Sequence, residues 1–596
     1  MMNAEQESGN LKSRLHGLKH RILAARGEIQ ADLVLKGGRV VNLFSGEIQE
    51  TDVAIYDNII VGLGTEYNGT HEVNVRDKWL APGLIDGHIH IESSMLVPSA
   101  LAQALLRHGT TAIVCDPHEI ANVMGLEGIR FMLEQSRHIP FDIFFMAPSC
   151  VPATHLETAG AELNAADLAP LKEESSVLGL AEMMNFPGLL AADPGVLEKI
   201  VLFRDRVLDG HCPLLTGQDL QAYLTPGISS DHESSRPEEA LEKVRSGLML
   251  MIREGTSAKN LDALLPVVNE QNAHRFCFVS DDLHAEDIER RGHLDFVIRK
   301  SIASGLDPVT AIRLATLNPA HYFGLKYRGA IAPGYMADIV VLDDLDRFEV
   351  NSVYKKGQLV VNDEKLIDFP DNESQTIKSI EKGPLKIAGF SADSLKIKHP
   401  PQKTGSPTGT KARIIELVPG QIFTHMRHET VKSSHGWVEG DISSDLLKLC
   451  VVERHHDTGN VGVGLVRGFG IKAGALASSV AHDSHNVIAV GVTDEAIARA
   501  VTVVRDMGGG LTVVRDDEVL ASVQLEVAGL MTQKPLSLLT EELKALKQAA
   551  LQLGCRVQDP FMTLSFLALP VIPEIKVTDK GVVDVNRFEV VPLFLS

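Results

Sequence analysis

Two histidines spaced two residues apart, His88 and His90, are the strongest chemical signal in this sequence and lie in the apolar stretch GLIDGHIHIESSM. A strand has a period of two, so both imidazoles lie on one face. In a parallel barrel that face points inward, and the carboxyl end of the strand opens toward the loops where barrel enzymes place their sites. Two imidazoles in that position can chelate a divalent metal ion.

More imidazole and carboxylate side chains follow at the ends of later strand-like runs. Glu182 ends the fourth run and Asp281 ends the eighth, while His211 and His232 lie at the ends of the fifth and sixth. With the first pair they supply enough ligands for two adjacent divalent ions, and a carboxylate such as Glu182 can bridge them. Taken singly, each of these residues also fits a purely structural role, and so does a first pair in which one ring packs and the other is hydrogen-bonded.

The elements that must position these residues form repeated strand and helix units. Residues 84–325 alternate short apolar runs with helical patterns such as 97–108, 194–206, 237–246 and 257–270, which is typical of a parallel sheet built from βα units. We place strands at 84–91, 110–116, 141–147, 176–182, 208–212, 229–233, 248–253 and 275–281. This length and alternation predict an α/β fold with a TIM-like (β/α)8 barrel.

The segments on either side of the barrel share a residue pattern that is typical of short β-strands. Short β-branched runs punctuated by Gly, Asn and Asp occupy 31–83 and 326–370, and we predict that they build one small β-sandwich into which the barrel is inserted. Residues 1–30 predict a helical leader, because apolar residues recur there at helical spacing. A Pro-, Gly- and Ser-rich stretch favours a linker over 371–412. Residues 413–596 mix strands with helices at 494–506 and 538–553, which predicts a C-terminal α+β domain.

Composition limits the classes of partner. The 57 Lys and Arg against 78 Asp and Glu give a formal charge of -21, which repels phosphate backbones and anionic lipid, so we expect neither nucleic acid nor a membrane as partner. The six cysteines form no CxxC pair and the first thirty residues lack an apolar signal core. We expect a cytoplasmic protein that assembles as a homo-oligomer, a dimer or higher.

The ordered set of strand-end residues resembles the amidohydrolase superfamily, and so does the flanking β-sandwich. Most binuclear members carry a carboxylated lysine on the fourth strand, whereas this sequence has Glu182 in GLAEMMNFPG. That departure agrees with the adenine deaminases, to which the motifs HIHIESSM, CDPHEIANVMG, PSCVPA, DGHCP, LMIREG, SDD and the C-terminal AHDSHN are also similar. The resemblance extends over nearly the whole chain.

This resemblance implies an enzyme of purine salvage that hydrolyses the small molecule adenine to hypoxanthine and ammonia. Two divalent ions, manganese or iron with zinc also open, would make hydroxide for attack on C6. Asp281 would accept the proton from water and Glu182 would share in proton transfer, and the division between them stays open. The resemblance implies as metal ligands His88, His90, Glu182, His211, His232 and Asp281.

The loop after the second strand carries further candidates. Pro117 stops that strand directly after Asp116, so the Asp116 carboxylate should face the mouth, where we expect it to orient the leaving amino group. His118 and Glu119 follow on the same loop as candidate substrate-binding residues, and loop hydrogen bonding or helix capping is the alternative for both.

Two further questions stay open. In AHDSHN, the residues His482, Asp483 and His485 resemble a metal cluster, but a hydrogen-bonded polar turn and a contribution to the active-site rim, from the same or a neighbouring subunit, are the interpretations that we weigh. A cyclic-amide hydrolase similar to hydantoinase or dihydroorotase is the alternative activity. A non-catalytic scaffold is the third, and the intact set of strand-end ligands argues against it.

Overall fold

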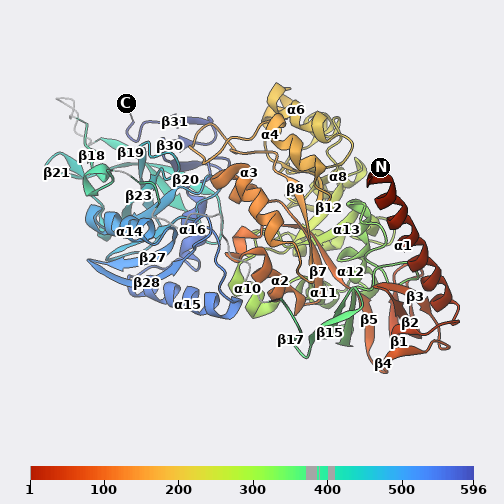
Figure 1. The fold of residues 1–596 in the computed structure, drawn as a ribbon. Coiled ribbons are helices and arrows are strands. Elements are labelled where there is room, and N and C mark those ends of the chain that lie inside the picture. The colour runs from red at the N-terminus through yellow and green to blue at the C-terminus, as the bar shows by residue number, and fades with distance from the viewer. Residues whose placement is uncertain (1, 371–384, 388, 401–409, 596) are drawn as a thin grey trace.

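Three regions follow one another across the molecule in the computed structural model, which describes residues 2–370, 385–387, 389–400 and 410–595. A β-sheet with the N-terminal helix lies at one end, the barrel lies in the middle, and the C-terminal unit lies at the other end (Figure 1). The barrel therefore has a neighbour on each side, and the C-terminal unit is the one that meets its active-site mouth.

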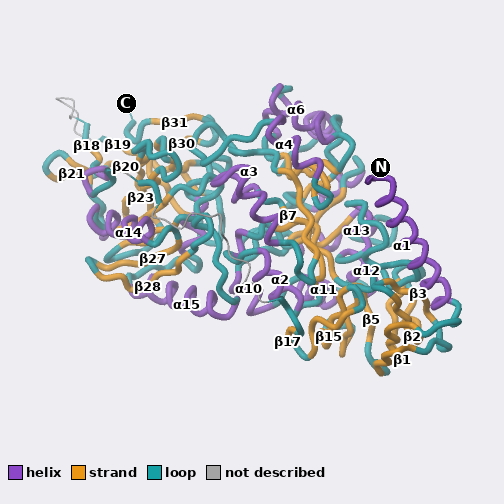
Figure 2. Tube along the Cα trace, viewed as in Figure 1, coloured by secondary structure: helices purple, strands orange, loops and turns teal. Residues whose placement is uncertain are grey.

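The two segments that flank the barrel in sequence join in one β unit (Figure 2). Strand β5 pairs antiparallel with β14 and thereby connects the halves of a nine-stranded sheet. Its strands are β1 Ala31–Asn42, β2 Glu47–Tyr56, β3 Ile59–Leu63, β4 Gly69–Asn74, β5 Trp79–Pro82, β14 Ile339–Asp344, β15 Glu349–Lys355, β16 Gln358–Asn362 and β17 Lys365–Leu366. Side chains of both halves, among them Leu35, Ile55 and Ile339, share one core, so the barrel is inserted between two parts of a single continuous sheet.

The N-terminal helix α1 (Met2–Ala25) lies against this sheet through its end. Ala24 is buried with Val34 and Val61. Leu15 and Ile22, which gave the helix its amphipathic pattern, are more than half exposed. The helix thus forms where the apolar spacing predicts it, but part of that apolar stripe faces outward instead of packing on the body.

Eight parallel strands form the barrel, so the predicted α/β fold class is confirmed. They are β6 Leu84–Ile89, β7 Thr110–Cys115, β8 Asp142–Ala147, β9 Val177–Met183, β10 Val207–Gly210, β11 Ser230–Asp231, β12 Met249–Arg253 and β13 Phe276–Val279. Continuous pairing runs from β6 to β10 and from β11 to β13. The N–H of Ser229 donates to the Leu208 oxygen at 2.9 Å, and the N–H of Asp281 donates to the His88 oxygen at 2.9 Å, which closes the ring at both gaps.

Alternating side chains separate the barrel interior from its helical coat. In β7, Ala112 and Val114 pack with interior residues such as Met251, whereas Ile113 and Cys115 pack outward against the helices. The helices are α2 Pro98–Leu106, α3 His118–Gln135, α4 Ala165–Leu168, α5 Phe186–Leu190, α6 Pro194–Phe203, α7 Gly217–Leu224, α8 Pro237–Arg245, α9 Leu261–Leu264, α10 Ala285–Arg291, α11 Leu294–Ala303, α12 Pro308–Leu314 and α13 Leu317–Tyr322. Every strand is therefore covered on both faces, as a parallel barrel requires.

The C-terminal unit is built on an eight-stranded sheet with the order β20-β19-β24-β23-β26-β25-β27-β28. Helix α14 packs on one face of the sheet, and α15 and α16 pack on the other. Its elements are β18 Ile397–Lys398, β19 Lys411–Leu417, β20 Thr424–Thr430, β21 Ser433–Ser434, β22 Trp437–Val438, β23 Leu446–Val452, β24 Val461–Arg467, β25 Ala475–Ser478, β26 Val487–Gly491, α14 Asp494–Asp506, β27 Gly510–Arg515, β28 Glu518–Gln524, α15 Leu536–Gln552, α16 Pro560–Phe566, β29 Ile575–Thr578, β30 Gly581–Asp584 and β31 Glu589–Val591. The α+β character predicted for this region is present.

Part of the segment predicted as a linker, 371–412, is structured. Residues 371–384, 388 and 401–409 lie outside the described residues. Between them, Leu395 is buried in the core beneath α14 and β18 pairs with β22. The described part therefore departs from the linker prediction, because its apolar side chains have a core to join.

The barrel and the C-terminal unit are joined by polar and backbone contacts. The N–H of Thr532 donates to the Met95 oxygen at 2.8 Å, and Lys547 on α15 pairs with Glu286 on α10. Behind the mouth, the carboxylate of Asp579 accepts a bond from the Thr158 hydroxyl at 2.6 Å. These contacts hold the C-terminal unit over the carboxyl ends of the barrel strands.

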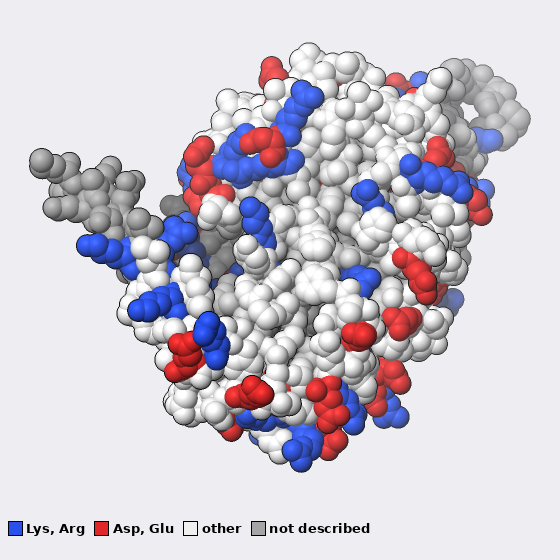
Figure 3. Space-filling model, turned by 90° about the vertical axis from the view of Figure 1, so that its right-hand side faces the viewer, with Lys and Arg blue, Asp and Glu red and all other residues white. Residues whose placement is uncertain are grey.

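The outer surface carries both signs of charge. On the face drawn in Figure 3, basic and acidic side chains are interspersed, and the middle of the face is mostly uncharged. Among the helices that the structure describes, none has the length and apolar character needed to cross a membrane.

We predict that Lys576→Met stabilises the C-terminal unit. Lys576 is fully buried in β29, its ammonium group donates to the Ile422 oxygen at 2.9 Å, and burial lowers its pKa to about 7. An unfolded lysine has a pKa of about 10.4, so the wild-type chain loses stability as pH falls from about 10 to about 7. The substitution should raise Tm by roughly 5 °C at pH 7, with the gain shrinking toward pH 10.

Calorimetry at both pH values checks this prediction, with Lys411→Met at an exposed strand position as the matched control. A gain that is the same at pH 7 and pH 10, or a loss at both, would show that the buried ammonium carries no such penalty.

Candidate metal centre

Strand β6 changes register where it delivers its two histidines. Ile85 packs in the barrel interior, and a Cβ on Gly87 would meet interior side chains such as Val279. The pairing of β6 with β7 then shifts between Asp86 and Ile89. As a result His88 and His90 both turn into the mouth, with ring centroids 4.8 Å apart and both side chains buried.

Glu182, at the end of β9, lies between two groups of imidazoles. Its Oε1 is 3.3 Å from the Nε2 of His90 and 3.8 Å from that of His88. Its Oε2 is 2.6 Å from the Nδ1 of His211 and 3.2 Å from the Nε2 of His232. Each carboxylate oxygen thus faces a different pair of ring nitrogens, which is the geometry of a carboxylate that can bridge two cations.

Asp281, just after β13, closes the first group. Its Oδ1 is 3.4 Å from the Nε2 of His88 and 3.2 Å from the Nε2 of His90, while its Oδ2 accepts from the Arg253 guanidinium at 2.6 Å. The backbone of Asp281 has a φ of 58°, a left-handed conformation that is uncommon for a residue with a side chain. Backbone strain of this kind gathers at functional sites.

The structure therefore brings together all six side chains that the sequence predicted as metal ligands. The Nε2 of His88 is buried and makes no hydrogen bond to any described residue. The outward-facing Nδ1 of His90 lies 3.1 Å from the Asp116 backbone oxygen, which leaves Nε2 free to act as a ligand. A buried nitrogen without a partner among imidazoles and carboxylates fits a divalent cation, so the donor set suits two such ions.

Electrostatics favour cations at this position. Burial raises the pKa of Glu182, but His232 and His211 outweigh that effect and hold the pKa well below its ordinary value. Burial also raises the pKa of Asp281, and Arg253 together with the neighbouring histidines again lowers it well below normal. Both carboxylates are therefore ionised at neutral pH, and their negative charge lies in a buried pocket where it is weakly screened.

Asp116 lies at the mouth as predicted, but its carboxylate is already engaged. One oxygen accepts the N–H of His118 at 3.1 Å and the other lies 3.0 Å from the Nδ1 of the same residue. Burial lowers the pKa of His118, yet Asp116 outweighs this and raises it well above normal. The His118 ring lies 4.6 Å from the ring of His90, so Asp116 reaches the site through His118.

Glu119 contacts the C-terminal unit. Its Oε1 is 3.0 Å from the Nδ1 of His482 and 3.4 Å from the hydroxyl of Ser93. His485 lies near this pair, and the three side chains resemble a further metal site. The Nε2 of His485, like that of His88, is buried without a hydrogen-bond partner among the described residues. However, the Nδ1 of His485 accepts the N–H of Ala481 at 3.2 Å, and in that tautomer Nε2 carries the proton and offers no lone pair to an ion. We therefore interpret this group as a polar contact between the two units.

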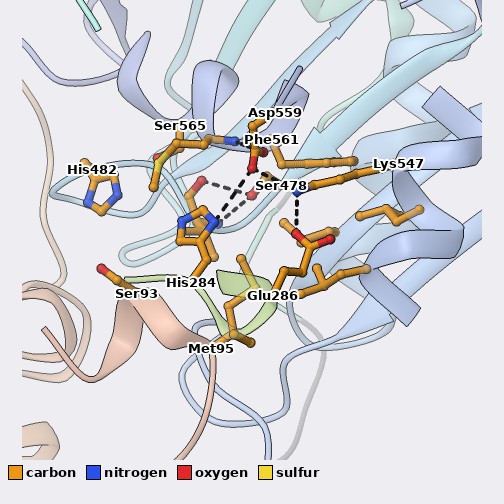
Figure 4. A pocket seen from close by; sticks show the side chains of 16 residues that line it. Ser93, Met95, His284, Glu286, Ser478, His482, Lys547, Asp559, Phe561 and Ser565 are labelled. Carbon is orange, nitrogen blue, oxygen red and sulfur yellow. Dashed lines mark hydrogen bonds and ion pairs between the residues drawn. The ribbon is translucent and has the colours of Figure 1, made fainter. Parts of the chain in front are cut away.

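A cavity adjoins the metal centre on the side of the C-terminal unit (Figure 4). Ser93 and His482 link it to the site, because both contact Glu119. At its other end Lys547 bonds to Glu286 and Asp559. Its walls are mostly apolar and come from both units, including Met95, Val480, Leu511, Leu543, Leu546, Phe561 and Met562. The cavity therefore lies between the two units, beside Glu119, and none of the six proposed metal ligands lines it.

Sequence reasoning missed the residues that hold the ligands in place. Arg253 forms a forked pair with Glu233, at 2.5 and 3.0 Å, while it also binds Asp281. Asp86 accepts the N–H of His88 at 3.1 Å and the Ser280 hydroxyl at 2.6 Å. The motifs LMIREG and SDD contain charged residues that directly follow strand-like runs, so these residues could have been noticed. Their spacing in the sequence does not indicate which of them contact each other.

The barrel, the inserted sheet and the strand-end set of histidines and carboxylates define an amidohydrolase. Residues 79–360 match the amidohydrolase family, and residues 421–589 match the adenine deaminase C-terminal domain. Proteins named adenine deaminase from Desulfatibacillum aliphaticivorans and Dehalococcoides mccartyi are 49% and 48% identical to this chain, and each match covers 96% of this chain and 99% of the relative. One from Geobacillus kaustophilus is 44% identical, with 97% and 99% covered.

This chain belongs to the adenine deaminase family, which confirms the resemblance inferred from its motifs. The match in the C-terminal domain is informative because the amidohydrolase barrel alone serves many reactions.

We predict that Glu182→Gln removes one of two bound ions. The amide keeps a single oxygen acceptor and cannot bridge, so metal analysis should fall from about two divalent ions per chain to about one. Glu119→Gln is the control, because Glu119 bonds to His482 and Ser93, and it should keep both ions. Two ions in the Glu182 variant would contradict the bridging position, and the loss of an ion in the Glu119 variant would contradict our interpretation of that group.

Proposed function

We propose that this chain hydrolyses adenine to hypoxanthine and ammonia, with two divalent ions held by His88, His90, Glu182, His211, His232 and Asp281. The observation that carries this proposal is the position of Glu182, with one carboxylate oxygen toward each of two groups of histidines. The family of the chain supplies the substrate, because its relatives over nearly the full length are named adenine deaminases.

Bound at these residues, divalent ions would lower the pKa of water to near neutrality and so provide a nucleophile without a strong base. Manganese or iron is our proposal for the ions, and zinc is the alternative. The donor set of imidazoles and carboxylates suits all three, so the ligands alone do not choose between them.

The residues around the pocket divide the proton transfers. Water adds to C6 of adenine and the ring carbon becomes tetrahedral; the C6–N bond then breaks, so that adenine and water give hypoxanthine and ammonia. Asp281 is the proposed acceptor of the water proton, because Arg253 holds its carboxylate ionised and oriented. Glu182, which is ionised, is the proposed carrier that takes one of the two water protons and passes it to a ring nitrogen. The other water proton, taken by Asp281, replaces the proton that the departing amino group receives.

The departing amino group needs a proton as well. Asp116 was predicted to orient this group directly, but both of its oxygens contact His118. We propose instead that Asp116 orients His118, whose ring faces the amino group and protonates it. Glu119 would not contact the reacting groups, and it would instead hold Ser93 and His482 in place.

The alternatives raised by the sequence receive no support from the relatives. The full-length relatives cited above are named neither as cyclic-amide hydrolases nor as scaffolds. The cytoplasmic location and the homo-oligomeric state, a dimer or higher, stay predictions, as does the absence of a nucleic acid or membrane partner.

Ammonia release tests the proposal directly. The purified chain loaded with manganese or iron should convert adenine to hypoxanthine, and it should release no product from hydantoin or dihydroorotate. Asp281→Asn keeps an oxygen ligand but removes the proton acceptor, so kcat should fall by about 10²- to 10⁴-fold while metal content is retained. A metal-loaded wild-type chain that is inert toward adenine would overturn the proposal.

A further inference from the structure

The loop between β25 and β26 carries the motif AHDSHN from the C-terminal unit into the mouth of the barrel. All six of its residues, 481–486, are buried. His482 bonds to Glu119 as described, and its ring stacks on Phe566 at 4.8 Å with an interplanar angle of 21°. Asn486 donates to the Thr158 oxygen at 2.8 Å. Figure 4 shows His482 across from Ser93 at the edge of the cavity, so the motif contributes His482 to the cavity wall and places Asp483 directly after it.

Within that wall, Asp483 has an oxygen that nothing satisfies. Its side chain is buried, and its Oδ2 makes no hydrogen bond to any described residue. Its Oδ1 lies 3.9 Å from the Nδ1 of His482. Burial raises the pKa of Asp483, and the charges of His118 and His482 partly offset that rise. A buried carboxylate oxygen without a donor costs free energy, and proteins retain such a group where a ligand supplies the donor.

The other carboxylates at the mouth are already engaged. Glu182 and Asp281 face the metal position, and Asp116 is held by His118. Asp282 accepts the Ser93 hydroxyl at 2.5 Å, and Glu119 pairs with His482 at 3.0 Å.

Four further buried carboxylates in the described part of the chain have an unpartnered oxygen, namely Glu92, Glu157, Asp209 and Glu254. The other oxygen of Asp209 accepts from Ser230 and Tyr322, and Glu254 accepts from Lys300. Glu92 accepts the N–H of Ile120 at 3.0 Å and lies on the barrel side of the mouth, where Glu119 and His90 are its charged neighbours. Glu157 lies behind the loop, where Asp483 is its nearest charged neighbour by effect, together with Asp579 and Lys580. Asp483 differs from the other four because it lies on the loop that the C-terminal unit brings to the mouth, with His118 and His482 as its charged neighbours.

Adenine, the substrate of the proposed function, has one N–H donor that the residues named so far do not bind. Its amino group and six-membered ring are served by His118, Glu182 and Asp281 in the reaction above. The N–H of its five-membered ring has no acceptor among these residues, and an N–H that becomes buried without an acceptor weakens binding.

We propose that Asp483 accepts the N–H of the five-membered ring of the purine, so that the C-terminal unit completes the substrate pocket and selects the free base over purines substituted at that nitrogen. This inference rests on the proposed function. A site that hydrogen-bonds a substrate N–H discriminates strongly against an analogue that lacks it, because the buried acceptor is then left unpaired. Nucleosides, which carry ribose on this ring, would be excluded both by the lost bond and by the buried loop.

The test compares Asp483→Ala and Asp483→Asn with the wild-type chain, all loaded with manganese. A hydrogen bond to a charged group is worth a factor of about 10 to 100, so kcat/KM for adenine should fall by that amount in the Ala variant, mainly through KM, and by less in the Asn variant. The inhibition constants of 9-methyladenine and 7-methyladenine give the readout that a structural role would not move. One of the two analogues carries its methyl group in place of the recognised N–H, and its inhibition constant should be the same for the variants and the wild type. Because adenine binds the variants more weakly, the difference in affinity between adenine and this analogue should be smaller in the variants.

The matched control is Asp142→Asn, which changes a carboxyl group paired with Lys355 and Arg328 at the amino end of β8, away from the mouth, and should leave kcat/KM and both inhibition constants unchanged. Metal content and Tm are measured for every variant. If the wild type converts adenine but neither Asp483 variant alters the preference for adenine over either methylated purine, this inference is wrong and the proposed function stands. If the metal-loaded wild type does not convert adenine, the proposed function fails instead.

Discussion

The carboxylate of Glu182 lies where two groups of imidazoles approach each other, and the rest of the site is arranged around that contact. A carboxylate can serve two cations only if its oxygens are held apart in direction, which a flexible loop would not ensure. Glu182 is the next-to-last residue of β9, which is paired with β8 on one side and β10 on the other, and its side chain is buried. The barrel thus supplies rigidity at the one residue where orientation decides whether two ions or one can bind.

The surrounding charges follow from this arrangement. Two buried carboxylates next to several imidazoles need opposite charge nearby, and Arg253 provides it by bonding to both Glu233 and Asp281. Asp86 and Ser280 fix the backbone on either side of the β6–β13 contact. On the far side, the C-terminal unit adds His482 and Asp483, which means that the barrel does not form the whole pocket by itself. An enzyme built in this way depends on the fold of its last domain for substrate binding, although we place none of the proposed metal ligands there.

The fold was largely readable from the sequence because its signals are local. Eight apolar runs separated by helical patterns required a barrel, and period-two spacing put His88 and His90 on one face. The register shift in β6, which turns both histidines into the mouth, is set by pairing with β7 and is not visible in the residue spacing.

Contacts such as Arg253 with Glu233, or His482 with Glu119, join residues from different strands or different domains, and their partners follow only from the three-dimensional fold. The role of Asp116 changed for the same reason, since its proximity to the mouth was predictable but its bond to His118 was not. The part of the predicted linker that is structured joins a core made of residues far away in the chain.

The most direct measurement of the central claim is anomalous X-ray diffraction from crystals of the full chain grown with manganese. Our account predicts two anomalous peaks in the barrel mouth, one next to each oxygen of Glu182, with His88 and His90 at the first and His211 and His232 at the second. A single peak, or a peak beside Glu119 and His482 with none at Glu182, would contradict it.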